Sequence, residues 1–216
     1  MRITHLGHAC LLIEAAGQRI LIDPGAFVPD FAEATDLDAI VVTHQHADHL
    51  DQKRVLDIRR RNRSAFVLAD PQSTAILVGL GIDTTAQNGT DHHVGPITIR
   101  PVGKKHALIH KDWPIIDNVG VVLTAPDEPS IYHPGDTLAE DPGEVDIACF
   151  PLNAPWQRSR EMTRFLRRLE VARAIPIHDG LLNETGRKLY LSQARTLGCA
   201  TTEIVDLAGG GPVDLT

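Results

Sequence analysis

Cysteine and aromatic residues are both scarce in this chain. Aromatic residues make up 4% of it, so the two tryptophans, Trp113 and Trp156, stand out. The three cysteines are an odd count without the spacing of a metal-binding motif; they are Cys10, Cys149 and Cys199. Each lies in or beside an apolar stretch. This predicts buried, reduced thiols in a cytoplasmic protein and argues against a disulfide-stabilised secreted domain.

Long hydrophobic runs are also missing. The first apolar run, from Ala9 to Ile13, is interrupted by Glu14 and has no notable basic segment before it. It falls far short of the roughly 20 residues of a membrane span. We therefore expect neither export nor a membrane anchor. The length of 216 residues suits one α/β domain over residues 1–216 and leaves no room for a large second domain.

Positive charge is in the minority, with 21 lysines and arginines against 28 acidic residues and a formal net charge of −7. A nucleic-acid-binding protein normally needs a basic face, so we expect no nucleic-acid partner. The one basic cluster, residues 59–63, falls at the end of a predicted helix, where cations are favoured by the helix dipole. The expected partner is a small-molecule substrate, and the sequence leaves a homo-oligomer open.

Residues 44–49, His-Gln-His-Ala-Asp-His, place four metal-ligand side chains within six positions. A short apolar strand is predicted before them (residues 38–43) and a helix after them (residues 51–61). Were the run helical, His44 and Asp48 would share a face while His46 pointed away. A strand-to-helix turn can aim all four inward. The pattern therefore predicts a metal site, and the alternative is a solvated, His-rich loop.

This HxHxDH run resembles the signature of the metallo-β-lactamase-fold hydrolases. That family continues with a lone His, an Asp in a Gly-Asp pair and a last His, which here would be His106, Asp136 and His178. The segments Ile3–Ala9 and Leu21–Pro24 also resemble the opening strands of that family. The likeness covers nearly the whole chain, and it is greatest to the compact subgroup that includes ascorbate-6-phosphate lactonase-like proteins.

The resemblance implies an α/β fold, the four-layer αββα metallo-β-lactamase sandwich. Carried over by position, one metal ion would be held by His44, His46 and His106, a second by Asp48, His49 and His178, and Asp136 would bridge the two. The implied cofactor is a pair of divalent ions, with zinc first and manganese or iron as alternatives. A metal-bound hydroxide would be the nucleophile, with Asp48 and Asp136 as the catalytic carboxylates.

Asp23 is predicted to accept an N–H from a ligand imidazole, which would fix the orientation of that ring. Its alternative role is to cap a strand-end turn before Pro24. Among the other histidines, structural or supporting roles are expected for His5 and His8, a sheet-packed position near the site for His133, a surface position for His110, and an exposed turn for His92 and His93.

Three residues on segments near the proposed ligands, Lys104, Trp156 and Arg158, are predicted to contact substrate. A cationic and aromatic rim would suit a small anionic molecule such as a phosphorylated lactone or a phosphodiester. Each could equally be a solvated surface residue. Two functions follow: a metal-dependent hydrolase of an ester, lactone or phosphodiester, or a non-catalytic metal-binding sensor or scaffold of the same fold.

The remaining pattern alternates strands with helices. A hairpin is predicted from residues 10–15 and 19–23, further strands at 65–69, 97–102, 119–124, 130–133, 145–152, 174–178 and 202–207, and helices from 70 to about 80, from 159 to about 171 and at 187–197.

Overall fold

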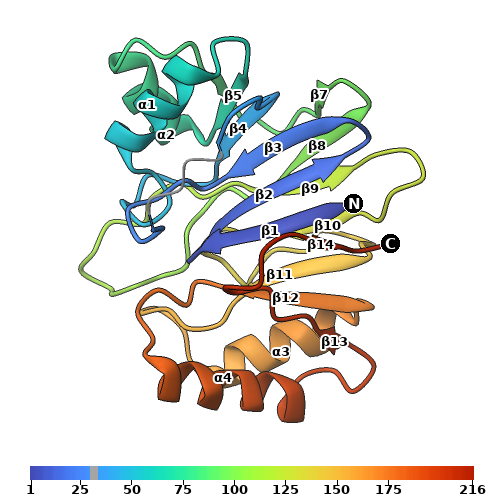
Figure 1. Cartoon of the computed structure of the whole chain (residues 1–216). Coiled ribbons are helices and arrows are strands. Elements are labelled where there is room, and N and C mark those ends of the chain that lie inside the picture. The colour runs from blue at the N-terminus through green and yellow to red at the C-terminus, as the bar shows by residue number, and fades with distance from the viewer. Residues whose placement is uncertain (30–33) are drawn as a thin grey trace.

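Two β-sheets form the centre of the molecule in the computed structural model, which describes residues 1–29 and 34–216. Figure 1 shows them stacked between two pairs of helices. The first sheet has the spatial order β14 (Val213–Asp214), β1 (Arg2–Gly7), β2 (Cys10–Ala15), β3 (Gln18–Ile22), β4 (Ala39–Val42), β5 (Phe66–Ala69) and β6 (Thr85–Ala86). The second has the order β13 (Glu203–Ile204), β12 (Arg173–Ile177), β11 (Ile147–Pro151), β10 (Ile131–His133), β9 (Gly120–Thr124), β8 (Ile97–Val102) and β7 (His92–Val94).

Each sheet is antiparallel in one half and parallel in the other. Strands β1 to β3 form an antiparallel meander, whereas β3 to β6 run parallel. In the second sheet β7 to β10 are antiparallel and β10 to β13 parallel. Parallel strands need crossover helices, which cover their outer face. Accordingly β4 and β11 are buried at every position.

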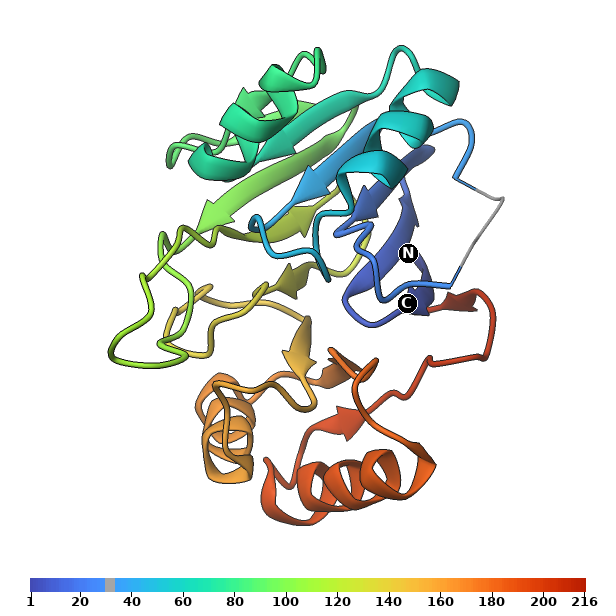
Figure 2. The same ribbon diagram turned by 90° about the vertical axis from the view of Figure 1, so that its left-hand side faces the viewer.

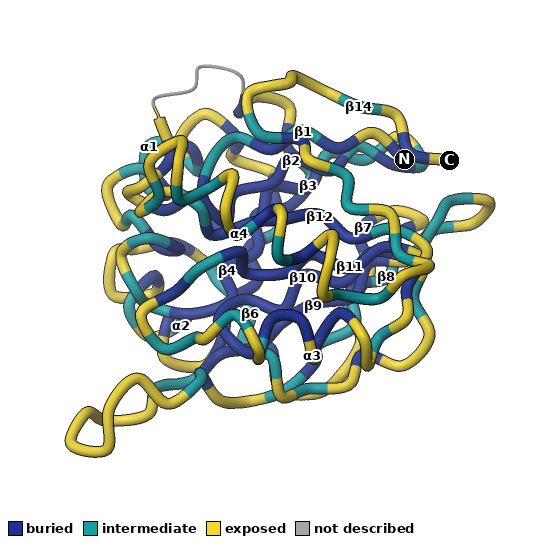
Figure 3. The backbone as a smooth tube through the Cα atoms, turned by 90° about the horizontal axis from the view of Figure 1, so that it is seen from below, coloured by how far each residue is buried: buried dark blue, intermediate teal, exposed yellow. Residues whose placement is uncertain are grey.

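The helices cover the outer faces of the sheets. Helices α1 (Gln52–Arg61) and α2 (Pro71–Gly79) cover the first sheet, and α3 (Ser159–Leu169) and α4 (Glu184–Leu197) the second. One apolar cluster fills the space between the sheets, and two more lie beneath the helix pairs. In Figure 3 the buried stretches of the backbone, drawn in dark blue, lie in the middle of the molecule. The predicted four-layer αββα sandwich is confirmed.

Several local predictions differ from the structure. His92 and His93 belong to β7, which pairs with β8 across a turn at Gly95, so the expected exposed turn lies two residues further on. Helix α4 begins earlier than predicted because the side chain of Asn183 caps it by accepting the Gly186 N–H. The short edge strands β6, β7 and β14 have too few residues to show a periodic pattern.

The cysteine prediction holds for two of the three thiols. Cys10 and Cys149 are buried, whereas Cys199 is only half-buried because it follows the last turn of α4 at the surface. Burial raises the pKa of both buried thiols. Among the described residues, no helix has the length and apolar character needed to span a bilayer.

Candidate metal centre

The run 44–49 lies on a turn between β4 and α1, as predicted. The turn is closed by hydrogen bonds from the backbone N–H groups of His49 and Leu50 to the carbonyl of His46, at 3.0 and 2.8 Å. It packs tightly against Gly25, where an added Cβ would lie 1.8 Å from the carbonyl oxygen of Asp48. Only glycine fits at that position, because the nearest atoms are backbone.

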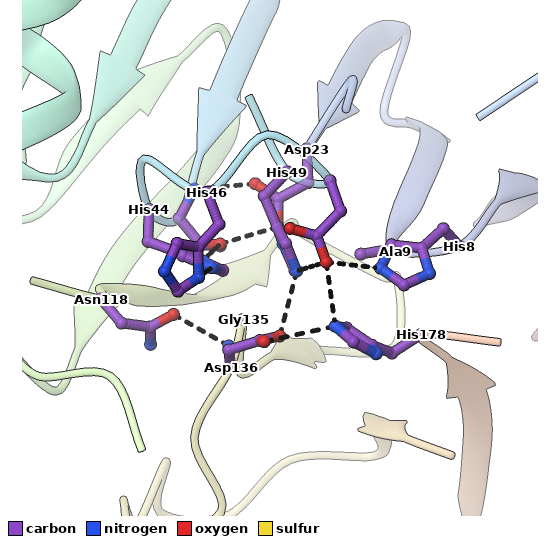
Figure 4. Close-up of polar contacts among 12 residues, drawn as sticks. His8, Ala9, Asp23, His44, His46, His49, Asn118, Gly135, Asp136 and His178 are labelled. Atoms are coloured by element: carbon purple, nitrogen blue, oxygen red, sulfur yellow. Dashed lines mark hydrogen bonds and ion pairs between the residues drawn. The ribbon is translucent and has the colours of Figure 1, made fainter. Parts of the chain in front are cut away.

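The tertiary structure brings the predicted ligands together in two neighbouring groups. In each group the potential ligand atoms lie within 4.8 Å of one another. One group contains His44, His46, His106 and Asp136, and the other contains His8, Asp48, His49 and His178. All seven residues predicted as ligands therefore lie in these groups, and His8 lies beside them. Figure 4 shows six of them converging from both sheets: His8, His44, His46, His49, Asp136 and His178.

Asp136 lies between the two groups. Its Oδ1 is 3.0 Å from Nε2 of His49, and its Oδ2 is 3.2 Å from Nε2 of His178 and 3.4 Å from Nε2 of His106. The carboxylate is buried and follows β10, after Gly135 at a φ of 60°. Its backbone N–H donates to Oδ1 of Asn118 at 2.9 Å. This position allows one carboxylate to serve both groups.

Unsatisfied polar atoms face the space between the groups. Despite these short contacts, four buried atoms there make no hydrogen bond of acceptable geometry within the described residues: Nε2 of His49, Nε2 of His106, Nε2 of His178 and Oδ1 of Asp136. Buried polar atoms are normally paired, so unpaired ones call for an explanation such as an ion. Imidazole nitrogens with carboxylate oxygens are the donor set of zinc and related divalent ions. The residues therefore fit a metal centre.

In three of the imidazole rings, the nitrogen that faces away from the centre is held by an oxygen acceptor. Nδ1 of His49 donates to Oδ2 of Asp23 at 2.7 Å. Nδ1 of His106 donates to the carbonyl of Ala107 at 2.6 Å, and Nδ1 of His178 to that of Asn153 at 2.7 Å. With the proton on Nδ1, the lone pair of Nε2 points into the centre, as a metal ligand requires.

Asp23 has the contact predicted for it. Besides His49, its carboxylate accepts the backbone N–H and the hydroxyl of Thr43, each at 2.7 Å. Asp23 is fully buried and adopts a positive φ of 49°, so it also forms the turn that follows β3. The two roles considered for Asp23, imidazole partner and turn residue, are thus combined in one side chain.

Charges in the centre are strongly coupled. Burial disfavours the imidazolium form of His49, but the carboxylates of Asp136 and Asp23 outweigh it and raise the pKa of His49 well above its usual range. Against the same burial cost, Asp136 and Asp48 raise the pKa of His178 to about 9. The neighbouring imidazoles hold the pKa of Asp136 far below its usual range despite its burial. A divalent ion would replace the protons that balance these carboxylates.

His8 has the supporting role expected for it, through a contact with one of the predicted ligands. It is buried, and its Nε2 lies 3.0 Å from Oδ2 of Asp48. Its carbonyl accepts the His178 N–H at 2.7 Å and a contact from Nε2 of His5 at 2.8 Å. The His5-Leu6-Gly7-His8 spacing was a visible signal. Its connection to Asp48 was not, because the two residues are 40 positions apart.

The predicted substrate residues are not brought together. Trp156 reaches the centre, where its indole N–H donates to Oδ2 of Asp136 at 2.9 Å. Lys104 is exposed and lines a separate cavity of about 700 Å³. Arg158 is exposed at the start of α3, where its backbone N–H donates to Glu161. His133 is buried near Asp23, and His110 is exposed, both as expected.

Comparisons with known proteins agree with this geometry. The family model described as "Beta-lactamase superfamily domain" matches residues 2–178. Protein Rv0786c of Mycobacterium tuberculosis is 38% identical over 192 residues, which cover 88% of this chain and 89% of that one. The UPF0173 metal-dependent hydrolase MK1542 of Methanopyrus kandleri is 30% identical over 201 residues, which cover 83% and 84%.

Solved structures show the same fold at low identity. The metallo-β-lactamase fold protein YhfI of Bacillus subtilis has a TM-score of 0.76 at 15% identity, with 98% of each chain covered. The isothiocyanate hydrolase from Delia radicum gut bacteria has a TM-score of 0.71 at 19% identity, covering 100% of this chain and 99% of that one. The chain therefore belongs to the β-lactamase superfamily, and it is a metal-dependent hydrolase.

Proposed function

We propose that this hydrolase uses two divalent metal ions to cleave an ester, lactone or phosphodiester bond in a small anionic substrate. The observation that carries the proposal is the place of Asp136, whose two carboxylate oxygens lie within 3.4 Å of imidazole nitrogens from both groups. One ion would be held by His44, His46 and His106, the other by Asp48, His49 and His178, with Asp136 shared. Zinc suits this donor set, as do manganese and iron.

When bound, two divalent ions would supply an activated water as nucleophile and would stabilise the negative charge that develops on the substrate. The protein's contribution is to hold Asp136 still. Its backbone is tied to Asn118, and its Oδ2 accepts the indole N–H of Trp156. A carboxylate so placed can receive a proton from the attacking water and pass it to the leaving group.

A non-catalytic metal sensor or scaffold is the alternative. It would need ligands, but it would not need a carboxylate shared by two groups, nor a cavity beside it. A cavity of about 590 Å³ adjoins the centre at His106 and Trp156, which supports a reaction with a bound small molecule. The enzyme is therefore the function that the geometry favours.

The direct test measures metal content and hydrolysis in the same samples. Native protein should carry two ions per chain by elemental analysis, and His106→Ala and His178→Ala should each bind about one fewer. His110→Ala is the matched control, because His110 is exposed outside both groups. A panel of esters, lactones and phosphodiesters should contain a substrate whose cleavage chelators abolish. Unchanged metal content in both ligand variants would refute the assignment, and complete metal loading without any turnover would support the scaffold.

A further inference from the structure

The cavity beside the metal centre has an apolar wall. It measures about 590 Å³, within the usual range of small-molecule sites. Leu108, Leu138, Trp156 and Phe165 contribute apolar surface to its lining. Trp156 also donates to Asp136, so the same side chain lines the cavity and touches the proposed reaction centre. A molecule in this cavity, called here the α3 cavity, would therefore reach the centre directly.

One residue of this lining, Leu108, belongs to the loop of residues 107–116, which projects from the body of the protein in Figure 2, in yellow-green. The loop is closed at its base by a β-bridge between Lys105 and Asp117. It exposes four large apolar side chains, with exposed fractions of 56% for Leu108, 39% for Ile109, 61% for Trp113 and 52% for Ile115. Several exposed large apolar side chains on one loop beside a cavity are typical of a binding surface.

Three cationic side chains line the cavity. Lys105, Arg164 and Arg168 line it, but Lys105 is paired with Asp117 at 2.7 Å. Arg168 donates to the carbonyls of Leu138 and Glu140, at 2.7 and 2.9 Å. Arg164 forms no ion pair within the described residues.

Two carboxylates, Glu161 and Glu140, also line the cavity. Glu161 accepts the Arg158 N–H at 2.8 Å. The side chain of Glu140 packs on Gly103, in the wall shared with the neighbouring cavity. Arg164 is thus the cation that remains available for a bound anion.

We infer that the α3 cavity binds an amphiphilic substrate: an apolar chain or ring against Leu108, Leu138 and Trp156, and one anionic group at Arg164. This inference rests on the proposed function and names its substrate class. A highly polar substrate such as a phosphorylated sugar lactone needs hydrogen-bond partners around its body, and this wall offers mainly carbon atoms. Burying a chain on the wall is favourable by up to about 0.8 kcal/mol per methylene, which corresponds to a fourfold gain in affinity.

The test uses butane-, hexane- and octane-1-sulfonate as probes, because sulfonates carry one charge and are weak metal ligands. Binding is followed by quenching of the two tryptophans or by calorimetry, in metal-loaded and in chelated protein. Affinity should rise with each methylene, by up to about fourfold, in both forms. The same affinity for all three probes would overturn the inference.

Variants separate the apolar from the charged contribution. Leu108→Ser should reduce the gain per methylene, whereas Leu189→Ser, at the same exposure of 56% on α4, should not. Arg164→Gln should lower the affinity for all three probes by a similar factor. Arg160→Gln, one turn earlier on α3, should leave these affinities unchanged. Equal effects of a variant and its control would count against the site. If probe affinity rises with chain length but no ester, lactone or phosphodiester of the panel is cleaved, the cavity stands and the proposed function is refuted. If a panel compound is cleaved but probe affinity does not depend on chain length, the proposed function stands and this inference is refuted.

Discussion

His8 donates a hydrogen bond to Asp48, with Nε2 and Oδ2 3.0 Å apart. The direction follows from the other side of the ring, where the backbone N–H of Gly180 donates to Nδ1 at 3.1 Å. A neutral imidazole carries one proton, so accepting at Nδ1 places that proton on Nε2. His8 therefore orients the carboxylate of Asp48 instead of offering Nε2 as a metal ligand. Its φ of 51° shows that the backbone is held in an unfavourable conformation to do so.

The first prediction concerns this hydrogen bond. His8→Ala should weaken binding of the ion at Asp48, His49 and His178 by roughly 10- to 100-fold, because a partner that orients a ligand is lost. His8→Gln should retain most of the affinity, since its amide N–H can replace Nε2. Titration with Co²⁺, followed by its absorption spectrum, measures the two sites separately. Equal loss in the Gln and Ala variants would show that His8 is a ligand and not a positioning residue.

The second prediction concerns Asp136. Asp136→Asn should keep the fold but lose roughly 10²- to 10⁴-fold in turnover, because a neutral amide cannot serve two cations or carry a proton. The comparison needs matched metal occupancy, measured on the same samples. Arg158→Ala, at the exposed start of α3, is the control and should change substrate preference at most. Full activity in Asp136→Asn with both ions bound would contradict the mechanism.

The third prediction concerns Gly25. Gly25→Ala should lower the free energy of unfolding by about 3 kcal/mol or more, because the new methyl group would overlap the backbone of Asp48. Metal content should fall with it, since the turn that carries Asp48 must move. Gly79→Ala is the control: it has open space around it in α2 and should be neutral or stabilising by up to about 1 kcal/mol. Denaturant unfolding and elemental analysis of both variants provide the comparison.

The fourth prediction concerns pH and Asp70. Burial outweighs the two Ser73 N–H contacts and raises the pKa of Asp70 to about 6, from the usual 3.8. Between these values the folded state binds more protons than the unfolded state, so the contribution of Asp70 to stability falls as pH rises through this window. Above this window, the buried charge of Asp70 lowers the free energy of unfolding by up to about 3 kcal/mol.

Asp70→Asn keeps the acceptor that caps α2 and removes the buried charge. Relative to wild type, this variant should therefore gain stability between pH 4 and pH 7. Urea unfolding of chelated protein at both pH values measures the difference. A stability difference that is the same at both pH values would show that Asp70 is not titrating in this range.

Much of the metal centre could be predicted from the sequence because its main signal is local. The six residues 44–49 follow an apolar strand and precede a capped helix, and both neighbours can be identified from short-range patterns. The later ligands also follow recognisable features: Asp136 follows Gly135, and His178 follows the apolar strand β12. Their spacing alone could not assign them to individual ions; the resemblance to the metallo-β-lactamase-fold hydrolases supplied the division into two groups.

Contacts between distant segments could be decided only by the tertiary structure. His8 meets Gly180 across 172 positions, and Trp156 meets Asp136 from the start of a different crossover. Neither pairing leaves a periodic or local mark on the chain. The α3 cavity likewise depends on how α3 packs beside the loop 107–116, which is why Lys104 and Arg158 were plausible substrate residues by sequence yet lie outside its lining. Local spacing and the family resemblance thus singled out the candidate ligands, whereas long-range packing determined what holds them and what can reach them.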